Sequence, residues 1–129
     1  MLDILEIKAK EDAPYVFMDA EEGFIEIKGK SFPPDVAKFY EPVIKWLKAY
    51  KTQGSKDLNL NLIMDYFNTA SSKIILDILY KLEEIDQTGK KVIVNWYYPE
   101  DDEEILDLGE EYEGLVELQF RHISYLEEF

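Results

Sequence analysis

Residues 58–64 read LNLNLIM, and the run DYFNTASSK follows them directly at residues 65–73. In the first run every second residue is leucine or methionine, the period of two that is typical of a strand buried on one face. The second run is polar and leads into a helical pattern of apolar residues, which predicts a helix over residues 70–86 that Gly89 closes. A strand that passes through a polar turn into a helix is the repeating unit of α/β proteins, so this stretch predicts that fold class.

Strand and helix patterns alternate on both sides of this unit. Apolar-rich runs predict further strands at residues 2–8, 15–19, 24–28, 91–97 and 116–120. Helical spacing predicts two more helices, one over residues 36–51 with Pro42 inside it and one over residues 99–112. Strands that alternate with helices imply right-handed crossovers between parallel neighbours. We therefore expect one α/β domain over residues 1–129, with a mixed central sheet of about five to six strands and about three helices.

The chain is strongly acidic, with 28 acidic and 14 basic residues and a formal net charge of -14. A surface of this sign argues against nucleic acid and anionic membranes as partners, because both carry negative charge themselves. Cysteine is absent, which removes disulfides, thiolate metal sites and cysteine nucleophiles. The sequence has neither the ~18 consecutive apolar residues of a membrane span nor the basic, apolar start of a signal peptide, so we expect a cytoplasmic protein.

Few residues in the chain suit catalysis. His122 is the only histidine and has no accompanying serine nucleophile motif, so we expect a surface or hydrogen-bonded histidine rather than a catalytic one. The scattered glycines form no phosphate-binding loop. Residues 100–113 hold nine acids and no base, but they lack the calcium-loop pattern and are typical of a solvated helix face. We therefore expect no catalytic residue, no metal and no cofactor.

The polar turn at residues 65–73 is the best candidate for a site, because ligands of open α/β sheets bind at the carboxyl ends of strands. It holds three hydroxyls, those of Thr69, Ser71 and Ser72. One interpretation is structural: Asn68 or Thr69 caps the helix and stabilises it by ~1 kcal/mol. A second is phosphorylation, because the free N–H groups and the dipole at a helix start accommodate a phosphate. A third is a small-ligand or nucleotide site, in which Thr69 and the helix start hold an anion.

A helical wheel at about 100° per residue sorts the helix after this turn into two faces. The face expected to pack on the sheet holds Ile75, Ile78, Leu79, Leu82 and Ile85. Ser71 falls on this face and should be the most buried of the three hydroxyls. Leu76 and Tyr80 fall roughly opposite, on the side of Thr69. Either they form a docking face beside a modifiable hydroxyl, or they are isolated surface residues or are covered by a neighbouring helix, and the pattern leaves both open.

Four stretches resemble the SiaC family of bacterial regulatory phosphoproteins. They are DYFNTASSK at residues 65–73, KGKSFPP at 28–34, FYEPVIKWL at 39–47 and WYYPEDDE at 96–103. They follow the order of the family and cover essentially the whole chain, and their combination makes the resemblance specific. Family members are related in fold to STAS domains, the anti-sigma-factor antagonists. The resemblance therefore implies a single STAS-like domain.

The resemblance also implies a function, that of a non-enzymatic partner switch. The phosphorylated threonine of the family falls on Thr69, which implies a dedicated kinase and a PP2C-type phosphatase as partners. The unphosphorylated form would bind and activate an effector, a diguanylate cyclase in the characterised systems, and so raise cyclic-di-GMP and promote biofilm formation. The residues that we expect to shape partner binding around Thr69 are Asn68, Ser72, Lys73, Leu76 and Tyr80.

Overall fold

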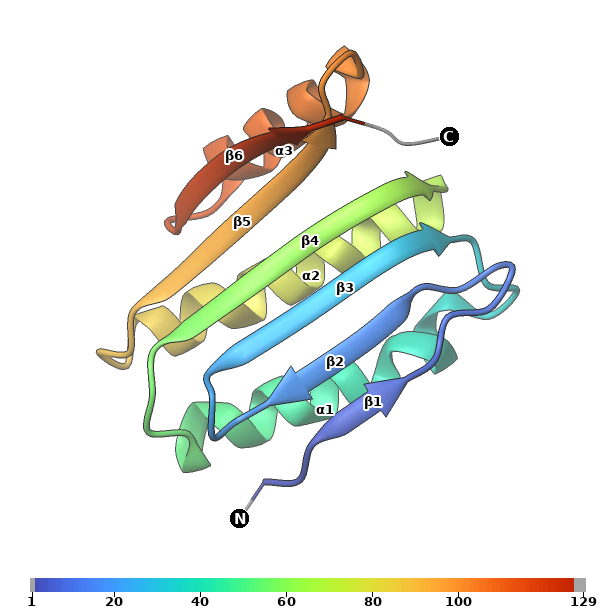
Figure 1. Ribbon diagram of the computed structural model, residues 1–129. Coiled ribbons are helices and arrows are strands. Elements are labelled where there is room, and N and C mark those ends of the chain that lie inside the picture. The colour runs from blue at the N-terminus through green and yellow to red at the C-terminus, as the bar shows by residue number, and fades with distance from the viewer. Residues whose placement is uncertain (1, 127–129) are drawn as a thin grey trace.

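The computed structural model describes residues 2–126, which contain one mixed sheet of six strands (Figure 1). The strands are β1 (Leu5–Ile7), β2 (Tyr15–Asp19), β3 (Phe24–Ser31), β4 (Leu58–Phe67), β5 (Val92–Pro99) and β6 (Gln119–Tyr125). They lie side by side in chain order. Neighbours from β1 to β3 are antiparallel, whereas neighbours from β3 to β6 are parallel. The predicted α/β class with a mixed sheet is therefore confirmed.

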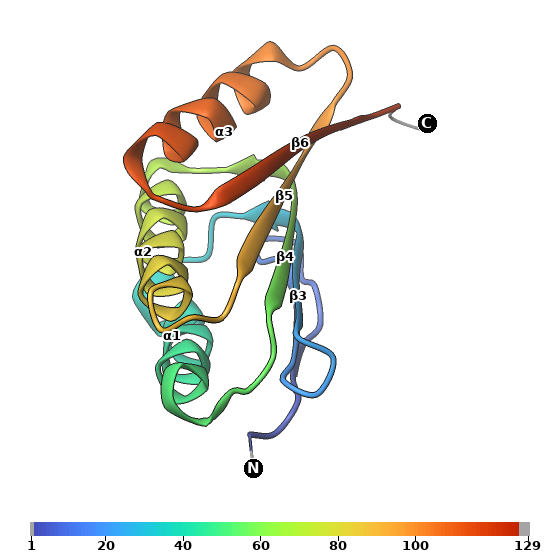
Figure 2. The same cartoon turned by 90° about the vertical axis from the view of Figure 1, so that its left-hand side faces the viewer.

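The described residues form three helices, each connecting two parallel strands. They are α1 (Val36–Gln53), α2 (Thr69–Asp86) and α3 (Glu103–Leu115). Figure 2 views the sheet along its edge, with all three helices on one side of it. Right-handed crossovers that advance across a sheet in one direction place their helices on the same face, which explains this arrangement. The other face of the sheet has no helix of the described residues over it.

The core lies between the sheet and the helices. The four alternating residues of β4 that were predicted to share one face are all buried: Leu58, Leu60, Leu62 and Met64. The predicted inner face of α2 is buried as well: Ile75, Ile78, Leu79, Leu82 and Ile85. Trp96 of β5 is also buried, and its indole N–H donates to the carbonyl of Ile105 at 2.9 Å, which holds α3 against the sheet. Pro42 lies inside α1 without ending it.

Some predicted boundaries are wrong, each for a physical reason. β4 continues to Phe67 rather than ending at residue 64, because its last residues still pair with β3, with Phe67 opposite Ser31. Pro99 ends β5 rather than beginning α3. Asp102 caps α3 instead, since its side chain accepts a hydrogen bond from the Ile105 N–H at 3.0 Å.

The last strand also begins later than predicted. It occupies Gln119–Tyr125 rather than residues 116–120. The reason is that α3 runs to Leu115, and pairing with β5 starts only at Gln119, opposite Ile93. The order of elements is unaffected by this shift.

Candidate functional site

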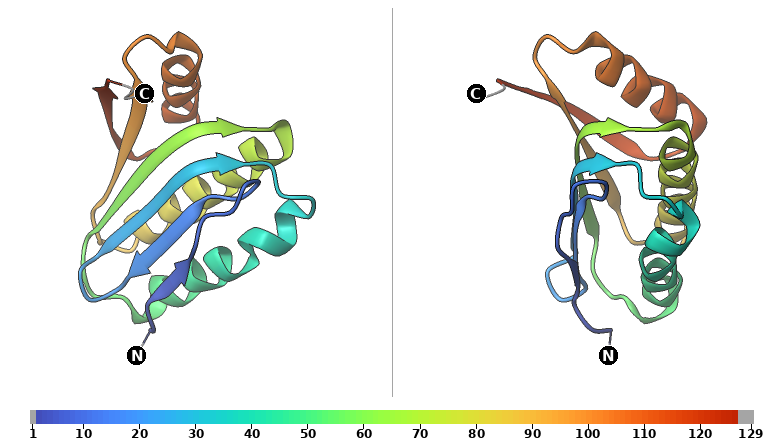
Figure 3. Two further views of the ribbon diagram at one scale, coloured as in Figure 1. Left: turned by 45° about the vertical axis from the view of Figure 1, so that its right-hand side comes forward. Right: turned by 90° about the vertical axis from the view of Figure 1, so that its right-hand side faces the viewer.

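Thr69 lies at the edge of the sheet where β3 and β4 end and α2 begins, which we call the carboxyl edge (Ser31, Phe67 and residues 68–73). Figure 3 shows this edge, with the ends of β3 and β4 beside the start of α2. Asn68 alone separates the last residue of β4 from Thr69, the first residue of α2. The Asn68 side chain accepts a hydrogen bond from the Ser71 N–H at 2.9 Å and therefore caps the helix. The Thr69 side chain is exposed and is not needed as the cap.

A buried chain of three hydroxyls fixes this turn to the core. Ser31 Oγ donates to Ser71 Oγ at 2.8 Å, and the hydroxyl of Tyr40 lies 2.6 Å from Ser31 Oγ. Because the Ser31 proton is directed at Ser71, Tyr40 is the donor in the second bond. Burial raises the pKa of Tyr40 to about 12, so its hydroxyl is protonated at neutral pH. Ser71 is fully buried, which confirms that it is the least accessible of the three hydroxyls in the turn.

Ser72 is hydrogen-bonded to Tyr112 of α3. The hydroxyl of Tyr112 donates to the backbone carbonyl of Ser72 at 2.8 Å. The hydroxyls of the two residues also lie 2.8 Å apart, and since the Tyr112 proton is already used, Ser72 is the donor there. Burial raises the pKa of Tyr112, and its bond with Ser72 opposes this rise only in part. Ser72 was expected to shape partner binding; its hydroxyl is half-buried and bonded within the fold.

The remaining predicted site residues lie further along α2. Lys73 is exposed one turn after Thr69, and Tyr80 is 39% exposed. Leu76, for which the wheel left exposure and coverage both open, is half-buried and packs against the core. It follows Ser72 by four residues and so lies on the same helix face, the one that α3 approaches through Tyr112. Partner contacts of these residues stay predictions.

Sequence reasoning missed an aromatic pair at the same edge. The rings of Phe32 and Tyr66 meet edge to face with centroids 5.9 Å apart, and the two residues are 38% and 51% exposed. Both lie in stretches that carry the family resemblance, but nothing in their pattern marked them as surface residues. Tyr66 follows the buried Met64 by two positions, so an uninterrupted strand would turn it inward.

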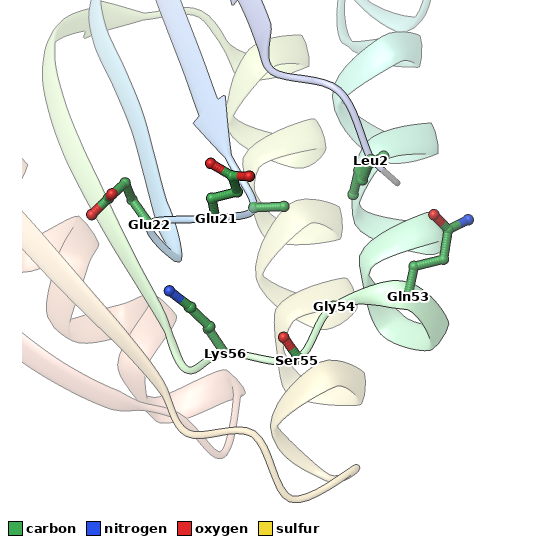
Figure 4. A pocket seen from close by; sticks show the side chains of 8 residues that line it. Leu2, Glu21, Glu22, Gln53, Gly54, Ser55 and Lys56 are labelled. Atoms are coloured by element: carbon green, nitrogen blue, oxygen red, sulfur yellow. The ribbon is translucent and has the colours of Figure 1, made fainter.

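A hollow of about 470 Å³ lies at the other end of the sheet (Figure 4). It is lined by the start of the chain, the β2–β3 turn and the segment that joins α1 to β4: Leu2, Ala20, Glu21, Glu22, Gln53, Gly54, Ser55 and Lys56. β4 begins at this end and reaches Thr69 only after its full length. The hollow therefore includes no residue of the turn that begins α2.

Three further features of the described residues concern metal binding, the single histidine and the hydropathy of the helices. Between residues 2 and 126, no group of three or more histidine, aspartate or glutamate side chains could hold a metal ion. His122 Nε2 lies 2.9 Å from Glu113 Oε1, which links β6 to α3. Within the same residues, each helix is too short or too polar to cross a membrane.

By its fold the chain belongs to the small α/β proteins with a mixed sheet and with all helices on one face. A family model described as SiaC family regulatory phosphoprotein matches residues 7–125. The chain is a member of the SiaC family.

Several known proteins are similar to it over most of their length. An uncharacterized protein of Pseudomonas aeruginosa (strain UCBPP-PA14) is 32% identical over 108 residues, which cover 84% of this chain and 86% of the relative. The crystal structure of the diguanylate cyclase SiaD in complex with its activator SiaC, from Pseudomonas aeruginosa, contains a chain that is 30% identical with a TM-score of 0.89, covering 94% of this chain and 99% of that one. The structure of SiaC of Pseudomonas aeruginosa is 28% identical with a TM-score of 0.87, covering 95% and 99%.

Proposed function

We propose that this protein is a non-enzymatic regulator that switches partners when Thr69 is phosphorylated and dephosphorylated in the cytoplasm. Its unphosphorylated form binds and activates a diguanylate cyclase. The observation that carries the proposal is the exposure of Thr69 as the first residue of α2, with capping left to Asn68. The complex of SiaD with its activator SiaC, in which the matched chain has a TM-score of 0.89, supports a cyclase as the effector.

The hydroxyls around Thr69 support its selection by a kinase. Ser71 is fully buried and receives a bond from Ser31, so a kinase has no access to it. Ser72 donates its proton to Tyr112 and would have to break this bond to react. Thr69 needs no rearrangement of the fold, because its side chain is exposed. We therefore propose Thr69 as the substrate of a dedicated kinase and of a PP2C-type phosphatase.

The switch works by adding negative charge at Thr69, where the partner otherwise meets a neutral hydroxyl. A phosphate adds about -1.5 to -2 charges and is tolerated at a helix start, where free N–H groups and the helix dipole favour anions. The fold stays intact because two nearby hydrogen bonds do not involve Thr69. They join the Ser71 N–H to the Asn68 side chain and the Ser31 hydroxyl to the Ser71 hydroxyl. Burying the dianion against a partner costs several kcal/mol, and a loss of about 1.4 kcal/mol already weakens binding tenfold.

Mass spectrometry of the chain co-expressed with a candidate kinase from the same genome tests the modification. We expect one phosphate, on Thr69, and none on the Thr69→Ala variant. Ser72→Ala is the matched control and should be phosphorylated like the wild type. Phosphorylation of Thr69→Ala to the wild-type level would disprove the assignment, and an unmodified Thr69 with a co-purified nucleotide would favour the ligand-binding alternative.

A further inference from the structure

An exposed aromatic pair stands next to the proposed switch. Phe32 and Tyr66 are 38% and 51% exposed, and their rings contact each other edge to face at 5.9 Å. Tyr66 lies three residues before Thr69 along the chain. Large aromatic side chains that are partly fixed by contact with each other lose little conformational freedom on binding, and they dominate the energetics of many protein interfaces.

A β-bulge builds this feature. Gly29 of β3 lies opposite Met64 of β4, but the next residue of β3, Lys30, lies opposite Tyr66. Asp65 is therefore an extra residue in β4, without a partner of its own in β3. Bulges of this kind redirect the side chains that follow them, and they are common beside functional sites.

The extra residue inverts the alternation of side chains at the end of β4. Met64 is buried, Tyr66 is exposed, and Phe67 turns inward with its ring centroid 6.5 Å from that of Trp96. Without the bulge, Tyr66 would follow Met64 into the core and Phe67 would be at the surface. The bulge thus places a tyrosine at the surface, beside Phe32.

Three segments of the chain meet at this edge. They are the β1–β2 connection (residues 8–14), residues 28–38 and residues 65–73. The backbone N–H of Phe32 donates to the carbonyl of Asp12 at 2.8 Å, which ties the first segment to the second. The pairing of β3 with β4 and a bond from the backbone N–H of residue 68 to the carbonyl of residue 31, at 3.1 Å, tie the second to the third.

The charge of these segments has the opposite sign from that of the whole chain. They hold six lysines and four acids: Lys8, Lys10, Lys28, Lys30, Lys38 and Lys73 against Glu11, Asp12, Asp35 and Asp65. The whole chain carries -14. These three segments together are therefore weakly basic on a strongly acidic protein, and both residues of the aromatic pair belong to them.

We propose that Phe32, Tyr66, Lys30 and Lys73 form a docking surface, the aromatic–lysine surface, for an effector that presents an apolar patch bordered by acidic side chains. This inference rests on the proposed function and names the chemistry of the partner. Charge complementarity selects an acidic border, because Lys30 lies opposite Tyr66 in the pairing of β3 with β4, whereas the chain as a whole carries -14 and repels acidic groups. Apolar contact with Phe32 and Tyr66 supplies the affinity.

The same charges connect docking to the switch. A phosphate on Thr69 brings about two negative charges, enough to cancel the excess of lysine over acid at this edge. Lys73, one turn along α2, is the nearest base on the same helix and would face the phosphate instead of the partner. An acidic partner then loses its attraction to Lys73 and is repelled by the phosphate, so one modification weakens binding in two ways.

Binding of full-length variants to the purified diguanylate cyclase of the same genome, measured by titration calorimetry, tests the surface. Phe32→Ala and Tyr66→Ala should each weaken binding by about tenfold or more, as expected for aromatic anchors. Lys30→Gln should weaken it by about threefold, and Asp65→Asn should strengthen it by a similar factor, because both change charge at the rim. Melting temperatures of all variants identify any loss of folding.

Matched controls use residues at other places on the chain. Leu115→Ala removes a side chain that is 50% exposed at the end of α3, and Lys91→Gln removes a lysine at the opposite end of the sheet. Both should bind like the wild type. Hydrogen exchange needs no variant, and residues 30–32 and 65–67 of the wild type should exchange more slowly in the complex than in the free protein.

The outcomes separate this inference from the proposed function. If the wild type does not bind the cyclase, the proposed function fails, and the docking surface fails with it because it has no partner. If the wild type binds but folded Phe32→Ala and Tyr66→Ala bind equally well, or residues 30–32 and 65–67 exchange no more slowly in the complex than in the free protein, the docking surface is wrong and the function stands. Tighter binding by Lys30→Gln with weaker binding by Asp65→Asn would disprove the acidic partner.

Discussion

The side-chain oxygen of Asn68 accepts a hydrogen bond from the backbone N–H of Ser71 at 2.9 Å, and this bond leaves the neighbouring Thr69 hydroxyl free for another role. A cap at Thr69 would be changed by the phosphorylation that we propose. With the cap one residue earlier, the helix start and the modifiable oxygen are separate groups. The fold can therefore carry either state of Thr69 on the same framework.

This separation predicts a contrast between neighbouring substitutions. Asn68→Ala should lower the free energy of unfolding by about 1 kcal/mol, because it removes the cap. Thr69→Ala should change it by less than about 0.5 kcal/mol, as is usual for exposed positions. Urea unfolding followed by circular dichroism measures both. An equal loss for the two variants would mean that Thr69 shares the capping role.

Much of this framework could be predicted from local sequence, and the reason is that its signals are periodic. The alternation of β4 and the apolar face of α2 gave the buried residues correctly, including Ser71. The exposure of Tyr66 could not be found this way, because it depends on one extra residue, Asp65, relative to a partner strand far away in sequence. Leu76 is half-buried and packs against the core, and the sequence of α2 alone leaves open whether another part of the fold covers it.

Tyr112 is expected to stabilise the start of α2. Tyr112→Phe removes the donor to the Ser72 carbonyl and the acceptor of its hydroxyl, so it should lower the free energy of unfolding by about 1–3 kcal/mol. Tyr80→Phe is the matched control, since Tyr80 is 39% exposed and should lose less than about 0.5 kcal/mol. The same urea experiment measures both variants. A Tyr112→Phe protein as stable as the wild type would show that α3 is not held through Ser72.

Tyr40 should give the stability a pH dependence in the alkaline range. Burial raises its pKa to about 12 in the folded state, against the usual tyrosine value of 10.0, so the unfolded chain loses this proton first as the pH rises. Stability is thus lost between these two values, and Tyr40 contributes about 1.4 kcal/mol of this loss by pH 11. Unfolding free energies of the wild type and Tyr40→Phe at pH 9 and pH 11 measure the difference. The variant should lose less stability than the wild type over this interval, and parallel losses would refute the buried hydroxyl chain.

Leu76 and Tyr80 should respond differently to a charge. Leu76→Lys places an ammonium group where the side chain packs against the core, so we expect a loss of about 1–3 kcal/mol in unfolding free energy. Tyr80→Lys, at a 39% exposed position, should stay within about 0.5 kcal/mol of the wild type. Thermal and urea unfolding measure both. A stable Leu76→Lys protein would mean that the Leu76 side chain contributes little to the core and lies on the outer face of α2.

The proposed switch makes its most direct prediction at Thr69 itself. Thr69→Ala should fold and bind the cyclase like the unphosphorylated wild type, because alanine adds no charge at this position. Thr69→Asp should fold equally well but bind at least about tenfold more weakly, since one buried charge facing the partner readily costs 1.4 kcal/mol or more. Calorimetric titration at two salt concentrations separates charge from shape, because repulsion between charges near the surface weakens as salt rises. Equal affinities of the alanine and aspartate variants at low salt would remove electrostatics as the cause of switching, whereas a gap that narrows with salt would assign the effect to the charge at the start of α2.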